Sequence, residues 1–254
     1  MKVRILGCGT STGVPKIGNE WGQCDPSEPR NARLRTSLLV DSDGQRMLVD
    51  CGPDLRQQLL AAKVDQLAGV IVTHAHGDHC HGIDELRPVS QANGGPVAMH
   101  ARKDVLDELR RRFDYAFAQS DFYRPVVVAQ PIDGDIRFGN VRARFVDQPH
   151  GGPISLGIRF DDNERSVGYA VDFSALTDDM MALYEGVDVW IADCLTRQPH
   201  PTHMHLDGVL NAARDLKVGQ VYLVHMGNGL DYRTLVNELP DWAAPAHDGL
   251  EFSL

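Results

Sequence analysis

A dense cluster of metal-ligand side chains occupies residues 73–79, Thr-His-Ala-His-Gly-Asp-His. It holds imidazole and carboxylate groups, the natural ligands of borderline divalent ions such as zinc and manganese. His74 and His76 are two positions apart, so on extended backbone their side chains point to one side and can share one ion. Asp78 and His79 come just past the turn and can face a second ion. The spacing therefore predicts a binuclear metal site, in which two ions activate a shared water.

The element that must position this cluster is the apolar run Gly69-Val70-Ile71-Val72 directly before it. Its β-branched residues are typical of a buried strand. The cluster then lies on the loop that leaves the C-terminal end of a strand, where α/β sheets tend to place their sites. The alternative is a solvated loop that is rich in histidine by chance. A regular ligand spacing at a strand end is hard to obtain from composition alone, so we favour a metal site.

The His-x-His-x-Asp-His cluster resembles the signature of the metallo-β-lactamase fold superfamily. That resemblance implies three further ligands, a His, a bridging Asp and a last His, each at the end of a later strand. The sequence has candidates in this order, each after a predicted strand: His150, Asp172 and His225. A lone His after a strand is weak evidence, but three ligands in the implied order strengthen one another. Four other histidines are expected at loop or surface positions away from the metals: His81, His100, His200 and His247.

Hydrophobic periodicity predicts an α/β (α+β) fold with four layers, an αββα sandwich of two mixed sheets with helices outside. We expect one domain over residues 1–254, with the metals in a cleft where strand ends from both halves converge. Strands are predicted at residues 3–6, 38–40, 47–49, 69–72, 136–138, 141–145, 155–160, 167–171, 187–192 and 221–224, and helices at 54–61, 83–91, 177–184, 206–216 and 232–238. Asp43-Gly44 and Gly139-Asn140 are predicted to form hairpin turns.

The first predicted helix carries two further expectations. Asp54 is placed to cap it, and Leu55, Leu59 and Leu60 are expected on its inner face.

The bulk composition is that of a globular enzyme: 254 residues, 43% apolar and 24% charged. A formal net charge of −10 argues against a nucleic-acid partner, which would need clustered Lys and Arg. We see no secretory segment and no apolar run of membrane-spanning length, and the five scattered cysteines indicate reduced thiols. We therefore expect a cytoplasmic protein without a membrane partner, and leave open whether it forms a homodimer.

Three more segments resemble the phosphodiesterase branch of the superfamily: residues 6–15 (Leu-Gly-Cys-Gly-Thr-Ser-Thr-Gly-Val-Pro), 33–40 and 48–54. They are similar to the tRNA 3′-processing endonucleases (tRNase Z) and, more closely, to the cyclic-phosphate phosphodiesterase of the carbon–phosphorus lyase pathway. The long Gly/Pro-rich arm of the tRNA-processing enzymes has no counterpart here. A structural zinc site of the cyclic phosphodiesterase is also expected to be absent, because Cys24 is the sole thiol near it and Asn228 replaces its histidine. Packing of Pro15, Trp21 and Pro26 should pin the loop at residues 15–29 instead.

The resemblance also implies roles for the ligands. One ion would take His74, His76 and His150, the other Asp78, His79 and His225, with Asp172 between them; the sequence leaves zinc and manganese open.

His203 falls where these phosphodiesterases keep their catalytic His, as general acid for the leaving group. Asp193 matches the acidic partner, which should raise the pKa of His203 and orient its ring. His205 is the other candidate acid, and either histidine could instead merely cap the helix at residues 206–216.

The expected function is metal-dependent hydrolysis of a small phosphodiester, cyclic substrates included. Thioester and lactone hydrolases share the seven ligands and are the alternative. A β-lactamase, a redox di-iron protein and a metal-bearing binding protein fit the sequence less well, for different reasons. A bridging Asp argues against a β-lactamase, and His76 in place of Glu argues against a redox di-iron protein. A complete ligand set argues against a protein that only binds metal.

Overall fold

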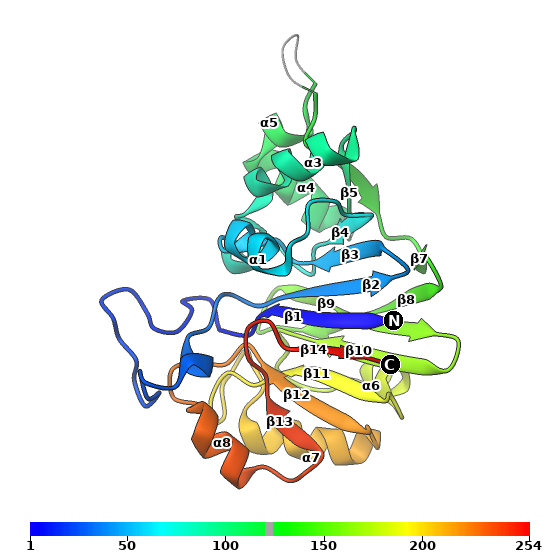
Figure 1. Ribbon diagram of the computed structural model, residues 1–254. Helices are drawn as coiled ribbons and strands as arrows, with labels where there is room; N and C mark the ends of the chain where they lie inside the picture. The colour runs from blue at the N-terminus through cyan, green and yellow to red at the C-terminus, as the bar shows by residue number, and fades with distance from the viewer. Residues whose placement is uncertain (120–123) are drawn as a thin grey trace.

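Two seven-stranded sheets form the centre of the computed structural model, which describes residues 1–119 and 124–254 (Figure 1). The strand order of the first sheet is β14-β1-β2-β3-β4-β5-β6, and that of the second is β13-β12-β11-β10-β9-β8-β7. The first sheet consists of β1 (Lys2–Gly7), β2 (Ser37–Ser42), β3 (Gln45–Val49), β4 (Gly69–Ile71), β5 (Val97–Ala101), β6 (Val127–Pro131) and β14 (Glu251–Ser253). The second consists of β7 (Ile136–Phe138), β8 (Val141–Pro149), β9 (Ile154–Asp162), β10 (Arg165–Ala170), β11 (Val189–Asp193), β12 (Gln220–Val224) and β13 (Ala243–Pro245).

The hydrophobic core has two layers, one on each face of the first sheet. Buried side chains of both sheets, such as Val3, Leu38 and Ile158, belong to one cluster. The opposite face of the first sheet packs against helices that lie over it in Figure 1: α1 (Leu55–Ala62), α3 (Leu86–Asn93) and α4 (Lys103–Arg112). Helices α6 (Asp178–Tyr184), α7 (Leu206–Leu216) and α8 (Tyr232–Glu238) contribute buried residues to the same cluster as the second sheet. The predicted αββα sandwich is confirmed.

Strand direction explains where a site can form. β3 to β6 run parallel to one another, and so do β10 to β13. The carboxyl ends of parallel strands meet at the same edge of a sheet, so loops that follow them lie together. Both predicted hairpin turns are present, and in the first one Asp43 (φ 53°) and Gly44 (φ 84°) adopt the left-handed conformation that tight hairpins require.

Several local expectations were wrong. Asp54 precedes α1 but makes no side-chain capping bond; its carboxylate instead accepts a hydrogen bond from the Arg35 backbone N–H at 2.8 Å. Leu60 lies on the outer side of α1, 62% exposed, because the buried face of this helix consists of Leu55, Gln58 and Leu59. The helix expected at residues 83–91 is a 3-10 turn, Ile83–Glu85, followed by α3. The inner strand β5 and the edge strands β6, β13 and β14 were not predicted. No helix of the described residues is long and apolar enough to cross a membrane.

Candidate metal centre

The loop after β4 carries the first four ligands. Residues 74–76 are extended, and the short helix α2 (Gly77–Cys80) then turns Asp78 and His79 toward the same region. Arg112 at the end of α4 donates a hydrogen bond to the Ala75 carbonyl at 2.5 Å and so holds the loop from its outer side. The side chains of His74 and His79 are almost completely buried, whereas His76 is exposed.

The remaining ligands come from the ends of three strands in the second sheet. His150 follows β8, Asp172 lies two residues past β10, and His225 follows β12. Asp172 and His225 both have φ of 57°, a left-handed conformation that is uncommon for residues other than glycine. Backbone strain of this kind, of order 1–3 kcal/mol for each residue, tends to occur at functional sites. The left-handed backbone of Asp172 and His225 directs both side chains from the strand ends toward the other proposed ligands.

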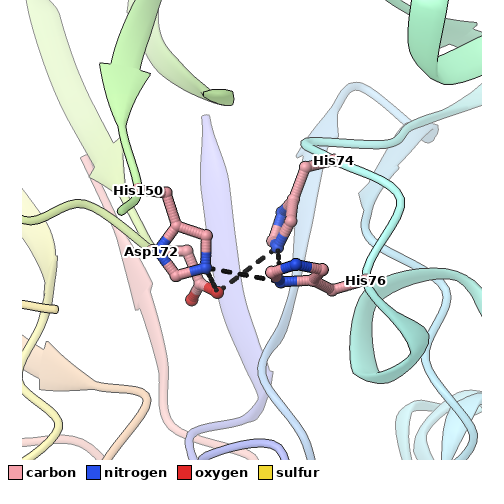
Figure 2. Close-up of side chains that lie close together, drawn as sticks. All are labelled: His74, His76, His150 and Asp172. Atoms are coloured by element: carbon pink, nitrogen blue, oxygen red, sulfur yellow. Dashed lines mark hydrogen bonds and ion pairs between the residues drawn. The ribbon is translucent and has the colours of Figure 1, made fainter. Parts of the chain in front are cut away.

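The ligands fall into two groups that share Asp172. In the first group, shown in Figure 2, His76 Nδ1 lies 2.9 Å from His74 Nε2 and 3.3 Å from His150 Nε2. Asp172 Oδ2 completes it, 3.3 Å from His74 Nε2 and 3.1 Å from His150 Nε2. In the second, His79 Nε2 lies 3.2 Å from Asp78 Oδ2, and His225 Nε2 lies 3.4 Å from Asp172 Oδ1. The donor atoms of His74, His76, His150 and Asp172 lie within 4.8 Å of one another, and so do those of Asp78, His79 and His225. A third set that meets the same limit is Asp172, His203 and His225.

Two buried atoms of this site have no hydrogen-bond partner among the described residues: His79 Nε2 and Asp172 Oδ1. A buried polar atom without a partner costs about 1–3 kcal/mol, so native proteins usually satisfy it. A divalent cation is bound by imidazole nitrogens and carboxylate oxygens that point to one place, and these residues provide both. The residues therefore fit two metal ions.

Three of the five proposed histidine ligands have a lowered pKa, which favours the same interpretation. At His79 and His150 burial is outweighed by neighbouring carboxylates, which raise the pKa. Burial, together with neighbouring His74 and His150, lowers the pKa of His76 to about 4. Burial also lowers the pKa of His74 and His225. These imidazoles are therefore neutral at pH 7, the form that binds a metal.

Hydrogen bonds from outside the ligand set fix four of the rings, and one of them joins His74 Nδ1 to Thr73 Oγ1 at 3.0 Å. His79 Nδ1 lies 2.7 Å from the buried Asp50 Oδ2, His150 Nδ1 lies 2.8 Å from the Thr202 carbonyl, and His225 Nδ1 lies 3.2 Å from Thr36 Oγ1. Such partners set the tautomer and leave the opposite nitrogen free for a metal. Sequence analysis assigned no role to Asp50, Thr36 or Thr202. A local signal did exist for Asp50, which follows the predicted strand at residues 47–49.

His203 and Asp193 form a pair beside the ligands. His203 Nδ1 lies 2.8 Å from Asp193 Oδ2, and the His203 ring stacks on His225 with centroids 5.1 Å apart. Asp193 is completely buried, whereas the side chain of His203 keeps 13% exposure.

The pKa of His203 is lowered, whereas the sequence led us to expect that Asp193 would raise it. Burial, opposed by Asp172 and assisted by nearby His150, lowers the pKa of His203. Burial raises the pKa of Asp193 well above its usual value. Desolvation thus outweighs the attraction between the two groups, and both shifts favour a neutral pair.

A cavity of about 320 Å³ opens onto this arrangement. Six of its lining residues belong to the ligand set and the His203 pair, namely His76, Asp78, His150, Asp172, His203 and His225. Ser11, Gly151, Pro153 and Thr202 form the rest of the wall. The glycine-rich segment at residues 6–15 therefore reaches the mouth of the metal site.

The other histidines lie elsewhere. His205 occupies the residue before α7 and belongs to no metal-ligand group of the described residues. His81 packs against Phe113, with ring centroids 5.7 Å apart, as expected for a ring turned from the metals. His200 is exposed, 5.4 Å from the His203 ring. His100 lies on β5 and His247 packs near Tyr232.

No third metal-ligand group occurs near Cys24 in the described part of the chain. The loop around it is held differently from our expectation, since Pro26 is exposed and Trp21 is only half-buried. A buried Arg33 instead donates hydrogen bonds to Leu230 O at 2.6 Å and Gly227 O at 3.1 Å, and its Nη1 lies 3.9 Å from Cys24 Sγ. The loop is therefore held by hydrogen bonds from Arg33 to the segment after His225, and not by the packing of Pro15, Trp21 and Pro26 that we expected.

Comparison with known proteins decides the family. A family model described as the beta-lactamase superfamily domain matches residues 45–226. The chain belongs to this superfamily. The predicted resemblance is confirmed, and the protein has the fold of the superfamily's metal-dependent hydrolases. A crystal structure of a diphosphatase from the PhnP family is 32% identical, with a TM-score of 0.90, and the match covers 99% of this chain and 97% of that one.

More distant members of the superfamily have other names. An octanoyltransferase from Porphyromonas gingivalis is 28% identical over 99% of this chain, which spans about half (51%) of that relative's length. Zinc-bound PqqB from Methylobacterium extorquens is 18% identical, with a TM-score of 0.79 and full coverage (100%) of both chains. Human short-form tRNase Z is 17% identical, with a TM-score of 0.73 and coverage of 100% and 99%. The last two share the fold.

Proposed function

We propose that this superfamily member is a binuclear metal-dependent phosphodiesterase that acts on small phosphodiesters, cyclic ones included. One observation carries the proposal: two ligand groups share Asp172, and the His203–Asp193 pair faces the same cavity. A site for cations alone would not need an acid beside it. Hydrolysis of an ester with a poor leaving group does need one.

The proposed ligands divide as the geometry groups them. His74, His76 and His150 would hold one ion, and Asp78, His79 and His225 the other, with Asp172 shared. Bound there, two such ions lower the pKa of a shared water and stabilise charge on phosphoryl oxygens. Mixed nitrogen and carboxylate ligands suit both zinc and manganese.

The protein's own contribution to the leaving-group step is proton transfer. Asp193 holds Nδ1 of His203, and no described residue forms a hydrogen bond with Nε2. We assign His203 the role of general acid: its Nε2 proton passes to the departing alkoxide oxygen while the Asp193 carboxyl proton moves to Nδ1, so that His203 ends as a neutral imidazole and Asp193 as a carboxylate. Asp193 is a positioning residue, because it keeps the ring in one orientation.

Three observations support the substrate assignment: the size of the cavity, the net charge of the chain and the name of a similar protein. The cavity of about 320 Å³ suits a small molecule, and a net charge of −10 disfavours a nucleic-acid partner. The 32% identical relative is named a diphosphatase, an enzyme that also cleaves at phosphorus.

The metal stoichiometry tests the first part of the proposal. Metal analysis of the protein after mild purification should give close to two zinc or manganese ions per chain. Asp78→Ala should lower this value to about one, because Asp78 belongs to the second group only. A value near one in the wild type that Asp78→Ala leaves unchanged would contradict a binuclear site.

The leaving group tests the second part. His203→Ala should slow the hydrolysis of dialkyl and cyclic phosphodiesters by about 10²–10⁴-fold, the usual worth of a general acid. The loss should be far smaller with bis-p-nitrophenyl phosphate, whose leaving group departs without a proton. His205→Ala, two residues away and outside the cavity, is the matched control and should change neither rate much. Equal losses on both substrates in His203→Ala would reject the acid assignment.

A second function, hydrolysis of thioesters or lactones, is favoured by the octanoyltransferase relative, whose name implies an acyl substrate. The metal-loaded protein should therefore be assayed against bis-p-nitrophenyl phosphate, 2′,3′-cyclic nucleotides, cyclic ribose phosphates, lactones and thioesters. If kcat/KM is higher for a thioester or lactone than for every phosphodiester, the protein is an acyl-ester hydrolase and the phosphodiesterase proposal is rejected.

A further inference from the structure

A second cavity, of about 470 Å³, lies on the other side of the loop that borders the metal centre. Ser11 lines the metal cavity, whereas Thr12, Gly13, Val14 and Pro15 line the second one, and no residue lines both. The remaining wall comes from β1, α1, the segment before β2 and the segment before β14. Neither the ligand set nor the His203 pair extends into this cavity.

The wall of this cavity is mainly apolar, and three arginines line it. The guanidinium of Arg33 binds the carbonyls of Gly227 and Leu230, which leaves the guanidinium groups of Arg4 and Arg35. Arg4 and Arg35 have side chains with 26% and 29% exposure, so both keep access to solvent. Next to each lies a glycine with positive φ. A Cβ at Gly249 would lie 3.6 Å from Arg4 Nη2, and one at Gly13 would lie 3.6 Å from Arg35 Nη1. The missing side chains leave room for a ligand beside each cation.

Arg4 is only partly engaged, because its Nη2 donates one hydrogen bond, to the Ala61 carbonyl at 3.3 Å. Glu251 pairs with Lys2 at 2.9 Å, and Arg4 lies farther from it, at 3.8 Å. Arg35 lies 3.3 Å from Asp54. Asp248 also lines the cavity, but both of its oxygens accept backbone hydrogen bonds, from Cys8 and Leu34.

Unsatisfied polar atoms provide independent evidence for a ligand. Gln58 is 2% exposed and lines the cavity, and its Nε2 donates to the Arg35 carbonyl at 2.8 Å. Its Oε1 has no partner among the described residues, and the same holds for Nε of Arg4 and of Arg35. The wall therefore has one acceptor and two donors without hydrogen-bond partners, and a polar ligand would provide those partners.

We propose that this cavity is a second binding site, which takes a small organic anion with an apolar body. The guanidinium groups provide charge-assisted hydrogen bonds to the anion. Leu6, Val14 and Pro15 provide the apolar surface. The segment behind the cavity also contacts the metal site, since Thr36 lies one residue from Arg35 and its hydroxyl meets His225 Nδ1 at 3.2 Å.

Calorimetric titration of the metal-loaded protein with phenyl phosphate tests the proposal. We expect one binding event at the metal centre and a second in this cavity. Arg4→Gln should weaken the second by at least about tenfold, because a charge-assisted hydrogen bond is worth about 1.5–3 kcal/mol. Gln57→Glu, at an exposed residue of the wall, adds a negative charge and should weaken it as well. Inorganic phosphate should bind there at least about tenfold more weakly than phenyl phosphate, because it lacks the apolar body.

Arg46→Gln is the matched control, since Arg46 is likewise a partly exposed arginine of the first sheet, pairs with Asp41 and stays outside the cavity. It should leave both binding events unchanged. The second event should persist in His74→Ala, which alters the metal centre alone. Circular dichroism checks that each variant is folded. A single binding event in the wild type, or a second event that Arg4→Gln and Gln57→Glu both leave intact, would overturn the proposal without affecting the metal centre.

Discussion

At the scale of single residues, the proposed metal centre would depend on side chains that are not among the proposed ligands. Asp50 is completely buried at φ 63°. Its carboxylate accepts hydrogen bonds from the backbone and hydroxyl of Thr73, and it lies 2.7 Å from His79 Nδ1. Burial by itself would lower the pKa of His79, but Asp50, Asp172 and Asp78 together raise it well above its ordinary value. A metal ion must therefore displace a proton from His79, and Asp50 keeps the ring aimed at the site.

Asp50→Asn should weaken the ion held by Asp78, His79 and His225. Removing a hydrogen-bond partner of a ligand typically costs 10–100-fold in metal affinity. Chelator competition should therefore show one ion with affinity reduced by about that factor, and the other with a smaller change. Asp41→Asn, a partly exposed carboxylate that pairs with Arg46, is the control and should leave both affinities unchanged. Equal loss of both ions in Asp50→Asn would point to general destabilisation instead.

At the scale of elements, the loop between β1 and β2 connects the metal site to the C-terminal third of the chain. Buried Glu28 pairs with Arg30 and Arg233, both at 2.6 Å. Buried Arg33 bonds the carbonyls of Gly227 and Leu230, just past His225. These ties hold the loop beside the strand end that presents His225, without a metal of their own.

Cys24→Ser should leave the metal content unchanged and shift the free energy of unfolding by no more than about 1 kcal/mol, because no ligand group includes Cys24. Arg33→Met should cost more, about 3 kcal/mol, since it leaves buried carbonyls without donors. Metal analysis and urea unfolding measure the two effects. Loss of one zinc per chain in Cys24→Ser would reveal a structural site in this loop.

At the scale of the whole molecule, Asp248 joins distant parts of the chain. Its carboxylate accepts hydrogen bonds from the backbone N–H groups of Cys8 (3.0 Å) and Leu34 (2.7 Å), and so ties the segment before β14 to the loop around the metal centre. Burial, opposed by these hydrogen bonds, raises the pKa of Asp248 from 3.8 to about 6. Between these two values the folded protein binds the proton more tightly than the unfolded chain does. The contribution of Asp248 to stability therefore falls as the pH rises through this range.

Asp248→Asn should remove this dependence. The difference in free energy of unfolding, wild type minus variant, should decrease by about 2 kcal/mol between pH 4.5 and pH 7.5. Urea unfolding at four pH values measures the slope, and ionisations shared by both proteins cancel in the difference. Asp41→Asn serves again as the control. An increase of the difference with pH would mean that the hydrogen bonds, rather than burial, dominate the pKa of Asp248.

The sequence by itself determined the chemistry of the metal centre. His74, His76, Asp78 and His79 lie within six positions, and the strand before them is visible as an apolar run. Ligand type and spacing are local properties, so they can be read without a fold. His150, Asp172 and His225 could be found because each follows a strand with a clear pattern, and because the resemblance gave their order. The structure brings all seven together, with His203 and Asp193 beside them.

Only the tertiary structure decided which distant groups support that site. Thr36, Thr202 and Asp50 act through contacts that span up to 189 positions, and no local periodicity records such contacts. The edge strands β13 and β14 are three residues long, too short to show an alternating pattern. The sign of the pKa shift at His203 depends on burial, which the types of its neighbours do not reveal. The second cavity exists because segments around Arg4, Gly13, Arg35 and Gly249 meet in space, and chain order says nothing of that meeting.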